Sequence, residues 1–446
     1  RGIRSNNRIM SSIFEKLLGN ELQSDKILIR HRNFSIKYKD IFKSEDINLD
    51  KIKEGNVVAL IGDYDGFTIK TFLKLIDKKA IIVPLTDDTK TLHNYYFNEA
   101  CVNFVIEKKK VRKLKSKKIK ILSDLKKKQQ SGLILFSSGT TGRPKAILHS
   151  LNELFKRYEG KKKSLVTMNF LLFDHIGGIN TLFFTLFNSG QIIIPYKRDV
   201  SEVIKDIQNF KIELLPTTPT FLRMLLFDDK LDVKKLKSLK IITYGAELMD
   251  SGTLEKISSL LPWVSFRQTY GMSEIGILKI KSESNSSLWI KIGGEGVEKK
   301  IVNNVLYLKT KNKMIGYLNS KSPFDKSGWY NTNDLVETRS DGFIKIVGRK
   351  SETISVGGLK ILPSEIERVA LKNKNIKNCK AYGKNNPITG QHVEIICETK
   401  RTNKDNQKIE SELKSSFKKE LLEGFVPLKI KFKKIEISYR FKKLIN

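Results

Sequence analysis

An alternation of short apolar runs with segments of helical spacing constrains the fold of this chain most strongly. Residues 54–63 contain an apolar run that ends in a turn, residues 66–77 carry apolar side chains at helical intervals, and another apolar run follows at 80–84. Strand, helix and strand in this order indicate a parallel α/β layer. The alternation recurs at residues 133–136, 165–168, 191–195, 212–215 and 240–244. The pattern predicts an α/β fold with doubly wound, mixed or parallel sheets.

The pattern changes after about residue 288, where apolar runs become short and are broken by Gly and Asn. These runs indicate a small antiparallel or barrel-like subdomain. They lie at residues 289–292, 299–302 and 305–309.

From Gly348 the chain has the pattern of a smaller α+β domain. A helix is expected to open at Pro363, a strand lies at 394–398, and a second helix covers 408–422. A chain of 446 residues exceeds what one hydrophobic core usually serves. We therefore expect two domains, with boundaries at residues 1–348 and 349–446.

The chain is strongly basic, with 83 Lys and Arg against 48 Asp and Glu and a formal net charge of +35. Such a charge is typical of proteins that bind nucleic acid or an anionic surface. The lysines are spread along the chain, however, and no aromatic-interleaved basic groove or known reader motif accompanies them. We interpret the charge as a solvated lysine surface and expect no specific nucleic-acid partner. The lysine runs lie at 108–110, 117–118, 126–128 and 161–163.

Three cysteines and the absence of long apolar segments indicate the compartment. Cys101, Cys379 and Cys397 form no CxxC pair or disulfide framework, which fits a reducing environment and a packing role. No run of about 18 apolar residues is present, and residues 1–12 lack the apolar centre of a secretory signal. We expect a cytoplasmic protein without a transmembrane segment.

A phosphate-binding loop is predicted where the apolar run 133–136 leads into Ser-Ser-Gly-Thr-Thr-Gly-Arg-Pro-Lys. Glycines let backbone N–H groups approach phosphate oxygens, hydroxyls donate further hydrogen bonds, and the lysine adds a positive charge. The spacing is not that of a Walker A loop, because no Ser or Thr follows the lysine. The candidate residues are Ser137, Ser138, Gly139, Thr140, Thr141, Gly142 and Lys145.

On this loop and on several later motifs, the chain from about Glu54 resembles the adenylate-forming (AMP-binding) superfamily. That superfamily contains acyl-CoA synthetases, the adenylation domains of peptide synthetases, and luciferases. The resemblance implies an enzyme that activates a carboxylic acid with ATP and Mg²⁺ as an acyl adenylate, with release of pyrophosphate.

The segment Gln268–Glu274 is similar to the family's Tyr-Gly-x-Thr/Ser-Glu motif. A tyrosine ring can stack on adenine, which suits Tyr270. The Ser273 hydroxyl can reach the α-phosphate, and Glu274 offers the hard carboxylate oxygens that Mg²⁺ prefers. By resemblance, these three residues bind the nucleotide, and Glu274 is the metal ligand.

Gly245, Ala246 and Glu247 follow the apolar run 240–244, at the strand end where ligand crevices of open α/β sheets form. In the family the matching segment lies along the adenine. An ordinary turn at a strand end remains the alternative explanation.

The segment Gly328–Asp334 resembles the family's Gly-Trp-x-x-Thr-Gly-Asp motif, whose aspartate binds the ribose hydroxyls. Asp334 would take that role here. Asn333 replaces the usual glycine, but Asn tolerates positive φ better than most residues, so we expect the turn to persist.

Residues 341–352 resemble the family's interdomain hinge. Arg349 would bind the ribose, and Ser351 stands where the family usually has a charged pivot. A small polar residue can still absorb a change in φ and ψ. Gly357 and Gly358 match the loop that approaches the pantetheine arm of the acceptor in CoA-using members.

Near the C-terminus the family has a Gly-Lys pair whose lysine polarises the reacting carboxylate. Lys443 aligns with that lysine and Lys442 with the glycine. Since lysine is abundant in this chain, Lys442 remains an alternative to Lys443.

The substrate acid is expected beside His175, which lies in a segment between an apolar run and an apolar helix at 181–187. In acyl-CoA synthetases a histidine here lies next to the carboxylate. A helix-capping role is the alternative for His175. Asp174 is a second alternative site, because amino-acid-activating relatives use an aspartate after Phe to hold an α-amino group. The His-Ile-Gly-Gly sequence that follows favours the acyl-CoA side.

The function we predict is that of an acid–CoA ligase, acting on a fatty or related acid with CoA as acceptor. A carrier-protein phosphopantetheine is the alternative acceptor. A nucleotide-binding protein without catalytic activity is the alternative from another class.

Overall fold

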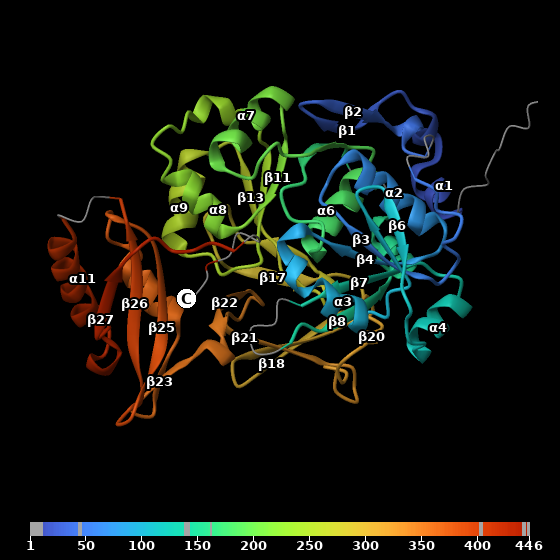
Figure 1. The fold of residues 1–446 in the computed structure, drawn as a ribbon. Coiled ribbons are helices and arrows are strands. Elements are labelled where there is room, and N and C mark those ends of the chain that lie inside the picture. The colour runs from blue at the N-terminus through green and yellow to red at the C-terminus, as the bar shows by residue number, and fades with distance from the viewer. Residues whose placement is uncertain are drawn as a thin grey trace, which may run out of the picture. The chain divides into compact units, whose positions relative to one another are not determined.

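In a computed structural model of the chain, the structure describes residues 12–42, 47–137, 143–160, 163–400, 405–438 and 443. The chain forms two compact units (Figure 1). The first contains residues 1–216, 271–277 and 312–322, and the second contains residues 217–270, 278–311 and 323–446.

The first unit contains a seven-stranded sheet that carries the predicted phosphate loop. The strand order is β20-β8-β7-β4-β3-β5-β6. Strands β3, β4, β5 and β7 are parallel, while β6, β8 and β20 pair antiparallel with their neighbours. The bounds are β3 Val57–Ile61, β4 Ile81–Leu85, β5 Phe104–Glu107, β6 Lys110–Lys113, β7 Gly132–Phe136, β8 Ala146–Ser150 and β20 Gly316–Tyr317.

The central strands β3, β4 and β7 of this sheet are buried on both faces, as a doubly wound fold requires. Val58 and Leu60 of β3 pack into one core cluster, whereas Val57, Ala59 and Ile61 pack into another. Helix α2 (Gly66–Asp77) begins at Asp65, whose carboxylate accepts a hydrogen bond from the Thr68 N–H. Helices α3 (His93–Glu99) and α4 (Lys120–Lys127) complete the connections.

A second group of strands in the first unit has the order β11-β9-β10-β1-β2. Strand β11 begins two residues later than the sequence predicted, because Lys211 adopts a left-handed conformation that ends α7 and the Ile212 N–H bonds back to that helix. The bounds are β1 Ile27–His31, β2 Phe34–Lys37, β9 Val166–Met168, β10 Gln191–Ile193 and β11 Leu214–Thr217, with helices α1 Ser12–Leu18, α5 Leu151–Phe155, α6 Ile176–Phe187 and α7 Val200–Phe210.

The second unit contains the parallel pair β12 (Ile241–Tyr244) and β13 (Ser265–Gln268), with helices α8 (Pro219–Leu226) and α9 (Ser251–Leu260). It also contains the predicted antiparallel sheet, in the order β16-β17-β22-β21-β19-β18. The bounds are β16 Lys279–Ser282, β17 Ile290–Gly293, β18 Val297–Val302, β19 Val305–Thr310, β21 Tyr330–Thr338 and β22 Ile344–Arg349.

The C-terminal part of the second unit is the predicted α+β segment, in orange and red in Figure 1. Helices α10 and α11 share a hydrophobic core with strands β25 and β26. The bounds are β23 Ile354–Val356, β24 Leu359–Ile361, α10 Pro363–Leu371, β25 Ile376–Asn386, β26 Gly390–Thr399, α11 Asn406–Glu420 and β27 Lys429–Phe432. The fold class is confirmed, while the boundary between residues 348 and 349 stays a prediction.

The structure bears on the cysteines and on the expected absence of a transmembrane segment. Cys101, Cys379 and Cys397 are all buried and free of disulfides. No helix among the described residues is long and apolar enough to cross a bilayer.

Candidate functional site

Strands β7 and β8 hold the two ends of the predicted phosphate loop. The Ser137 N–H donates to the Lys145 carbonyl at 3.0 Å, and the Lys145 N–H donates to Ser137 Oγ, also at 3.0 Å. These reciprocal bonds continue the antiparallel pairing of Phe136 with Ala146. The loop therefore leaves and re-enters the sheet at one point. The loop residues Ser138, Gly139, Thr140, Thr141 and Gly142 lie outside the described residues.

The Ser273–Glu274 turn belongs to the same unit and is tied to β8 by a buried histidine. His149 Nε2 lies 2.6 Å from the Ser273 carbonyl oxygen. Since a carbonyl only accepts, Nε2 carries the hydrogen. Burial lowers the pKa of His149 to about 4, so the ring is neutral near pH 7. His149 thus fixes the turn without adding charge.

Tyr317 links Glu274 to Lys145. Its hydroxyl donates to Glu274 Oε1 at 2.8 Å, and Lys145 Nζ lies 5.1 Å from the centre of its ring. Tyr317 is held in place because it pairs with Ile147 of β8. Ser137, Lys145, Ser273 and Glu274 are therefore connected within one unit, although 128 to 137 positions separate the loop ends from the turn in sequence.

Neither His149 nor Tyr317 was predicted. A signal for His149 exists in the sequence, since a histidine in an otherwise apolar strand just after the loop needs a hydrogen-bond partner. Tyr317 gives no comparable signal, because its two partners are distant in sequence.

Glu274 could be one ligand of a magnesium ion whose remaining ligands are the phosphates of the substrate. Mg²⁺ is usually bound by one or two carboxylates together with phosphates and water. The bond from Tyr317 uses one lone pair of Oε1, and a carboxylate has about four. Among the described residues no group of three or more His, Cys, Asp or Glu could hold a metal, so the phosphates would have to complete the coordination.

His175 caps helix α6. Its Nδ1 accepts a hydrogen bond from the Gly177 N–H at 3.1 Å. The helix starts at Ile176, five residues before the apolar helix that the sequence predicted. The ring is half-buried and Asp174 is buried beside it. The capping geometry agrees with the alternative explanation for His175, and its contact with a carboxylate stays a prediction.

In the second unit, Tyr270, Asp334 and Arg349 form a contiguous polar group. The Tyr270 hydroxyl donates to Asp334 Oδ2 at 2.5 Å, and Arg349 Nε donates to Asp334 Oδ1 at 3.3 Å. Asp334 and Arg349 are direct cross-strand partners in β21 and β22. Burial raises the pKa of Asp334, and the two donors oppose that shift. The three residues predicted to bind adenosine thus contact one another.

The expected turn at Asn333 is an irregularity within strand β21, and Asn333 has the positive φ that its sequence predicted. Asn333 has φ of 61°, in the left-handed region that glycine usually occupies. The Asn331 side chain accepts a hydrogen bond from the Asn333 N–H at 2.8 Å. Asparagine therefore adopts the left-handed conformation in the place of the family's glycine.

The segment Gly245–Glu247 forms a constrained turn after β12. A Cβ atom at Gly245 would lie 2.2 Å from Thr269 Oγ1, so only glycine fits. Ala246 has φ of 68°, a strained value for alanine. The Glu247 carboxylate accepts hydrogen bonds from the N–H groups of Thr220 and Lys443, each at 3.2 Å.

Lys443 reaches this turn with its backbone but not with its ammonium group. Its Nζ donates to the Cys379 carbonyl at 2.8 Å and to Glu367 Oε2 at 3.3 Å. Only 12% of the side chain is exposed. In this arrangement the lysine is bound within the α+β segment. Lys442 lies outside the described residues.

Gly357 and Gly358 form the two-residue turn between β23 and β24. Their φ values are 59° and 83°, as a type I′ hairpin turn requires at both positions. Added Cβ atoms would meet nothing within 4 Å. The turn alone accounts for both glycines, and contact with an acceptor stays a prediction.

The chain belongs to the AMP-binding enzyme family, whose model matches residues 55–304, more than half of the chain. The family confirms the resemblance that the motifs indicated.

Similar proteins include several acid–thiol ligases. A 4-coumarate–CoA ligase-like protein from Arabidopsis thaliana is 29% identical over 55% of this chain and 50% of its own length. A medium/long-chain fatty acid–acyl-carrier-protein ligase, FadD10 of Mycobacterium tuberculosis, is 26% identical over 56% and 52%. The chain spans about half the length of these curated relatives.

Solved structures share the fold over nearly the whole chain. ATP-bound MatB from Rhodopseudomonas palustris superposes with a TM-score of 0.80, over 97% of both chains, at 18% identity. At this level of identity the likeness establishes the fold and leaves the substrate open.

Proposed function

We propose that this protein is an AMP-forming acid–thiol ligase. It activates a carboxylic acid, of the fatty or a related acyl class, with ATP and then transfers the acyl group to a thiol. The observation that carries the proposal is the connected set Lys145–Tyr317–Glu274 beside the ends of the phosphate loop. A cation and a carboxylate that contact the same tyrosine, one at its ring and one at its hydroxyl, suit a triphosphate with its magnesium ion.

In the first step a carboxylate oxygen attacks the α-phosphorus of ATP. The new phosphorus–oxygen bond forms while the bond to the bridging oxygen of pyrophosphate breaks, and pyrophosphate leaves. No protein nucleophile is required, so the residues act by positioning and charge stabilisation. Lys145 and the loop bind the leaving phosphates, and Ser273 binds the α-phosphate.

When bound at Glu274, a magnesium ion would neutralise phosphate charge. Tyr270 lies along the adenine with Gly245, Ala246 and Glu247, while Asp334 and Arg349 bind the ribose. His175 lies beside the carboxylate of the acid.

In the second step the acceptor thiolate attacks the acyl carbon, and AMP leaves with the carboxylate oxygen it gained. For this step the domain that begins near residue 349 turns at Ser351, exchanging Lys443 for the Gly357–Gly358 turn. CoA is the acceptor we favour. A carrier-protein phosphopantetheine is the second candidate, favoured by the carrier-protein ligases among the relatives.

Exchange of labelled pyrophosphate into ATP tests the first step. We expect exchange that depends on one class within a panel of fatty, aryl and amino acids. Exchange with an amino acid would instead favour the alternative in which Asp174 holds the α-amino group of the substrate. If no acid supports exchange although the protein is folded and binds ATP, the proposed enzymatic activity is refuted and a nucleotide-binding role without catalysis is supported.

A further inference from the structure

Basic residues are concentrated in residues 108–128 far beyond the rest of the chain. Twelve of these 21 residues are Lys or Arg and one is Asp, whereas the whole chain has 83 Lys and Arg among 446 residues. The average composition would place only about four there. All twelve basic side chains are exposed. We call these twelve side chains the lysine surface.

The fold presents the lysine surface on an anchored scaffold. Strand β6 is the edge strand of its sheet, and Val111 packs against one core cluster. Leu114, Ile119 and Ile121 pack against the other cluster, where Leu122 and Leu125 of α4 are buried. Because these apolar residues face inward, the basic side chains between them face solvent. Figure 1 shows β6 and α4 within the same part of the first unit.

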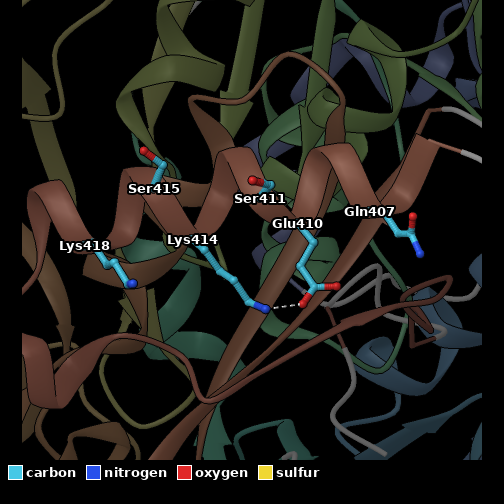
Figure 2. Close-up of a pocket in the computed structure, with 6 residues that line it drawn as sticks. All are labelled: Gln407, Glu410, Ser411, Lys414, Ser415 and Lys418. Carbon is cyan, nitrogen blue, oxygen red and sulfur yellow. Dashed lines mark ion pairs between the residues drawn. The ribbon is translucent and has the colours of Figure 1, made fainter.

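Acidic side chains of the protein leave this charge almost uncompensated. Within residues 108–128, all of which the structure describes, the single ion pair joins Lys127 to Asp124 at 4.0 Å. The exposed face of α11 differs. It lines a shallow pocket where Lys414 pairs with Glu410 at 2.6 Å among Ser and Gln side chains (Figure 2). The lysine surface therefore retains its charge for a partner outside the chain.

The composition of the lysine surface favours one class of anionic partner over the others. Eleven of its twelve basic residues are Lys, and no large apolar or aromatic side chain in residues 108–128 is exposed. Protein interfaces are depleted in Lys and enriched in aromatic residues, and single-stranded nucleic acid is held by aromatic stacking. A bilayer with acidic headgroups requires charge alone, and each nearby Lys adds to the attraction.

Protection of the sheet edge explains only part of the pattern. Lysines on an edge strand discourage pairing with other chains, which accounts for β6. It does not account for Lys115, Lys117 and Lys118, which follow the strand, or for Lys126–Lys128 at the end of α4. We propose that the lysine surface binds the anionic surface of a lipid bilayer, electrostatically and without insertion.

Cosedimentation with vesicles tests this proposal without reference to catalysis. The probes are vesicles of phosphatidylcholine with about one third phosphatidylserine, and vesicles of phosphatidylcholine alone. The test variant is K115Q/K117Q/K118Q, which removes three charges from a segment without strand or helix. The control is K408Q/K418Q/K419Q on α11, which removes the same charge from another exposed face.

We expect binding to the acidic vesicles only, weakening as salt rises. The test variant should lose at least tenfold in affinity, because three lysines each contribute roughly fivefold. The control should lose less than about threefold. Equal losses in both variants would show that net charge alone is responsible and would overturn the proposal. Tighter binding to duplex DNA, lost in the same variant, would assign the surface to nucleic acid instead.

Discussion

Tyr317 joins two residues of the first unit that are predicted to bind the nucleotide and its metal ion, Lys145 and Glu274. Its ring faces the Lys145 ammonium while its hydroxyl donates to Glu274. A direct ion pair between these two charges would make each less available to a phosphate or a magnesium ion. We infer that Tyr317 keeps the two charges apart and oriented.

Tyr317→Phe should therefore weaken the use of magnesium. The ring remains for Lys145, but Glu274 loses its donor and can turn toward the ammonium group. We expect the magnesium concentration for half-maximal pyrophosphate exchange to rise about ten- to a hundredfold, because a hydrogen bond to a charged group contributes roughly 1.5–3 kcal/mol. Tyr307→Phe is the control, since the Tyr307 hydroxyl accepts a hydrogen bond from Asn331 in the second unit's sheet. An unchanged magnesium dependence would show that Tyr317 does not keep Glu274 available for the magnesium ion.

His149 predicts a pH dependence of stability. Burial lowers its pKa to about 4 from the ordinary 6.5. Above pH 6.5 the ring is neutral in both states. As pH falls from 6.5 toward 4, His149 binds a proton in the unfolded chain but stays neutral in the native protein, so the free energy of unfolding decreases.

At pH 5 this decrease is about 2 kcal/mol. His149→Gln keeps a side-chain donor for the Ser273 carbonyl but does not titrate, so it should lose less stability between pH 7 and pH 5 than the native protein. Urea unfolding of both proteins at the two pH values measures the difference. Identical losses would mean that His149 is not neutral and buried as described.

Lys443 should matter for one half-reaction only. Lys443→Gln is expected to slow adenylate formation at least a hundredfold, because the reacting carboxylate loses its cation, while thioester formation from supplied adenylate continues. Lys429→Gln, an exposed lysine of β27, is the control. Equal loss of both half-reactions would contradict the assignment of Lys443.

At the scale of elements, the turn at Ser351 is the hinge that we propose between the two half-reactions. Ser351 lies in the single 3₁₀ turn Lys350–Glu352 that follows β22. Ser351→Pro should fix its φ near −65° and restrict the change that a hinge needs. We expect pyrophosphate exchange to persist while thioester formation falls at least tenfold. Ser351→Ala should preserve both, and a proline variant with both steps intact would exclude this hinge.

The sequence predicted those elements whose signals are local. The positive φ of Asn333 and the helix that opens at Pro363 could be recognised because a few adjacent residues determine their conformation. The partners of Glu274 could not be recognised, since Tyr317 lies 43 residues and His149 124 residues from the turn. Only the sheet that pairs β8 with β20 brings them together. The start of α6 was misplaced because the two glycines after Ile176 weaken its helical pattern.

At the scale of the whole molecule, the basic charge has two components. Most lysines are scattered and solvated, as the composition suggested, but residues 108–128 hold a local concentration, and the structure shows that its basic side chains are exposed. A protein that combines it with acid activation would act beside a bilayer, where apolar acids partition. That arrangement is consistent with a fatty acid as substrate, which remains a proposal.

Transfer of a labelled oxygen atom tests directly whether a carboxylate attacks the α-phosphorus of ATP. An accepted acid labelled with ¹⁸O in its carboxylate is turned over with ATP and the thiol, and AMP and pyrophosphate are analysed by mass spectrometry. The account predicts one ¹⁸O atom in each AMP and none in pyrophosphate. Label in inorganic phosphate, with formation of ADP, would contradict it.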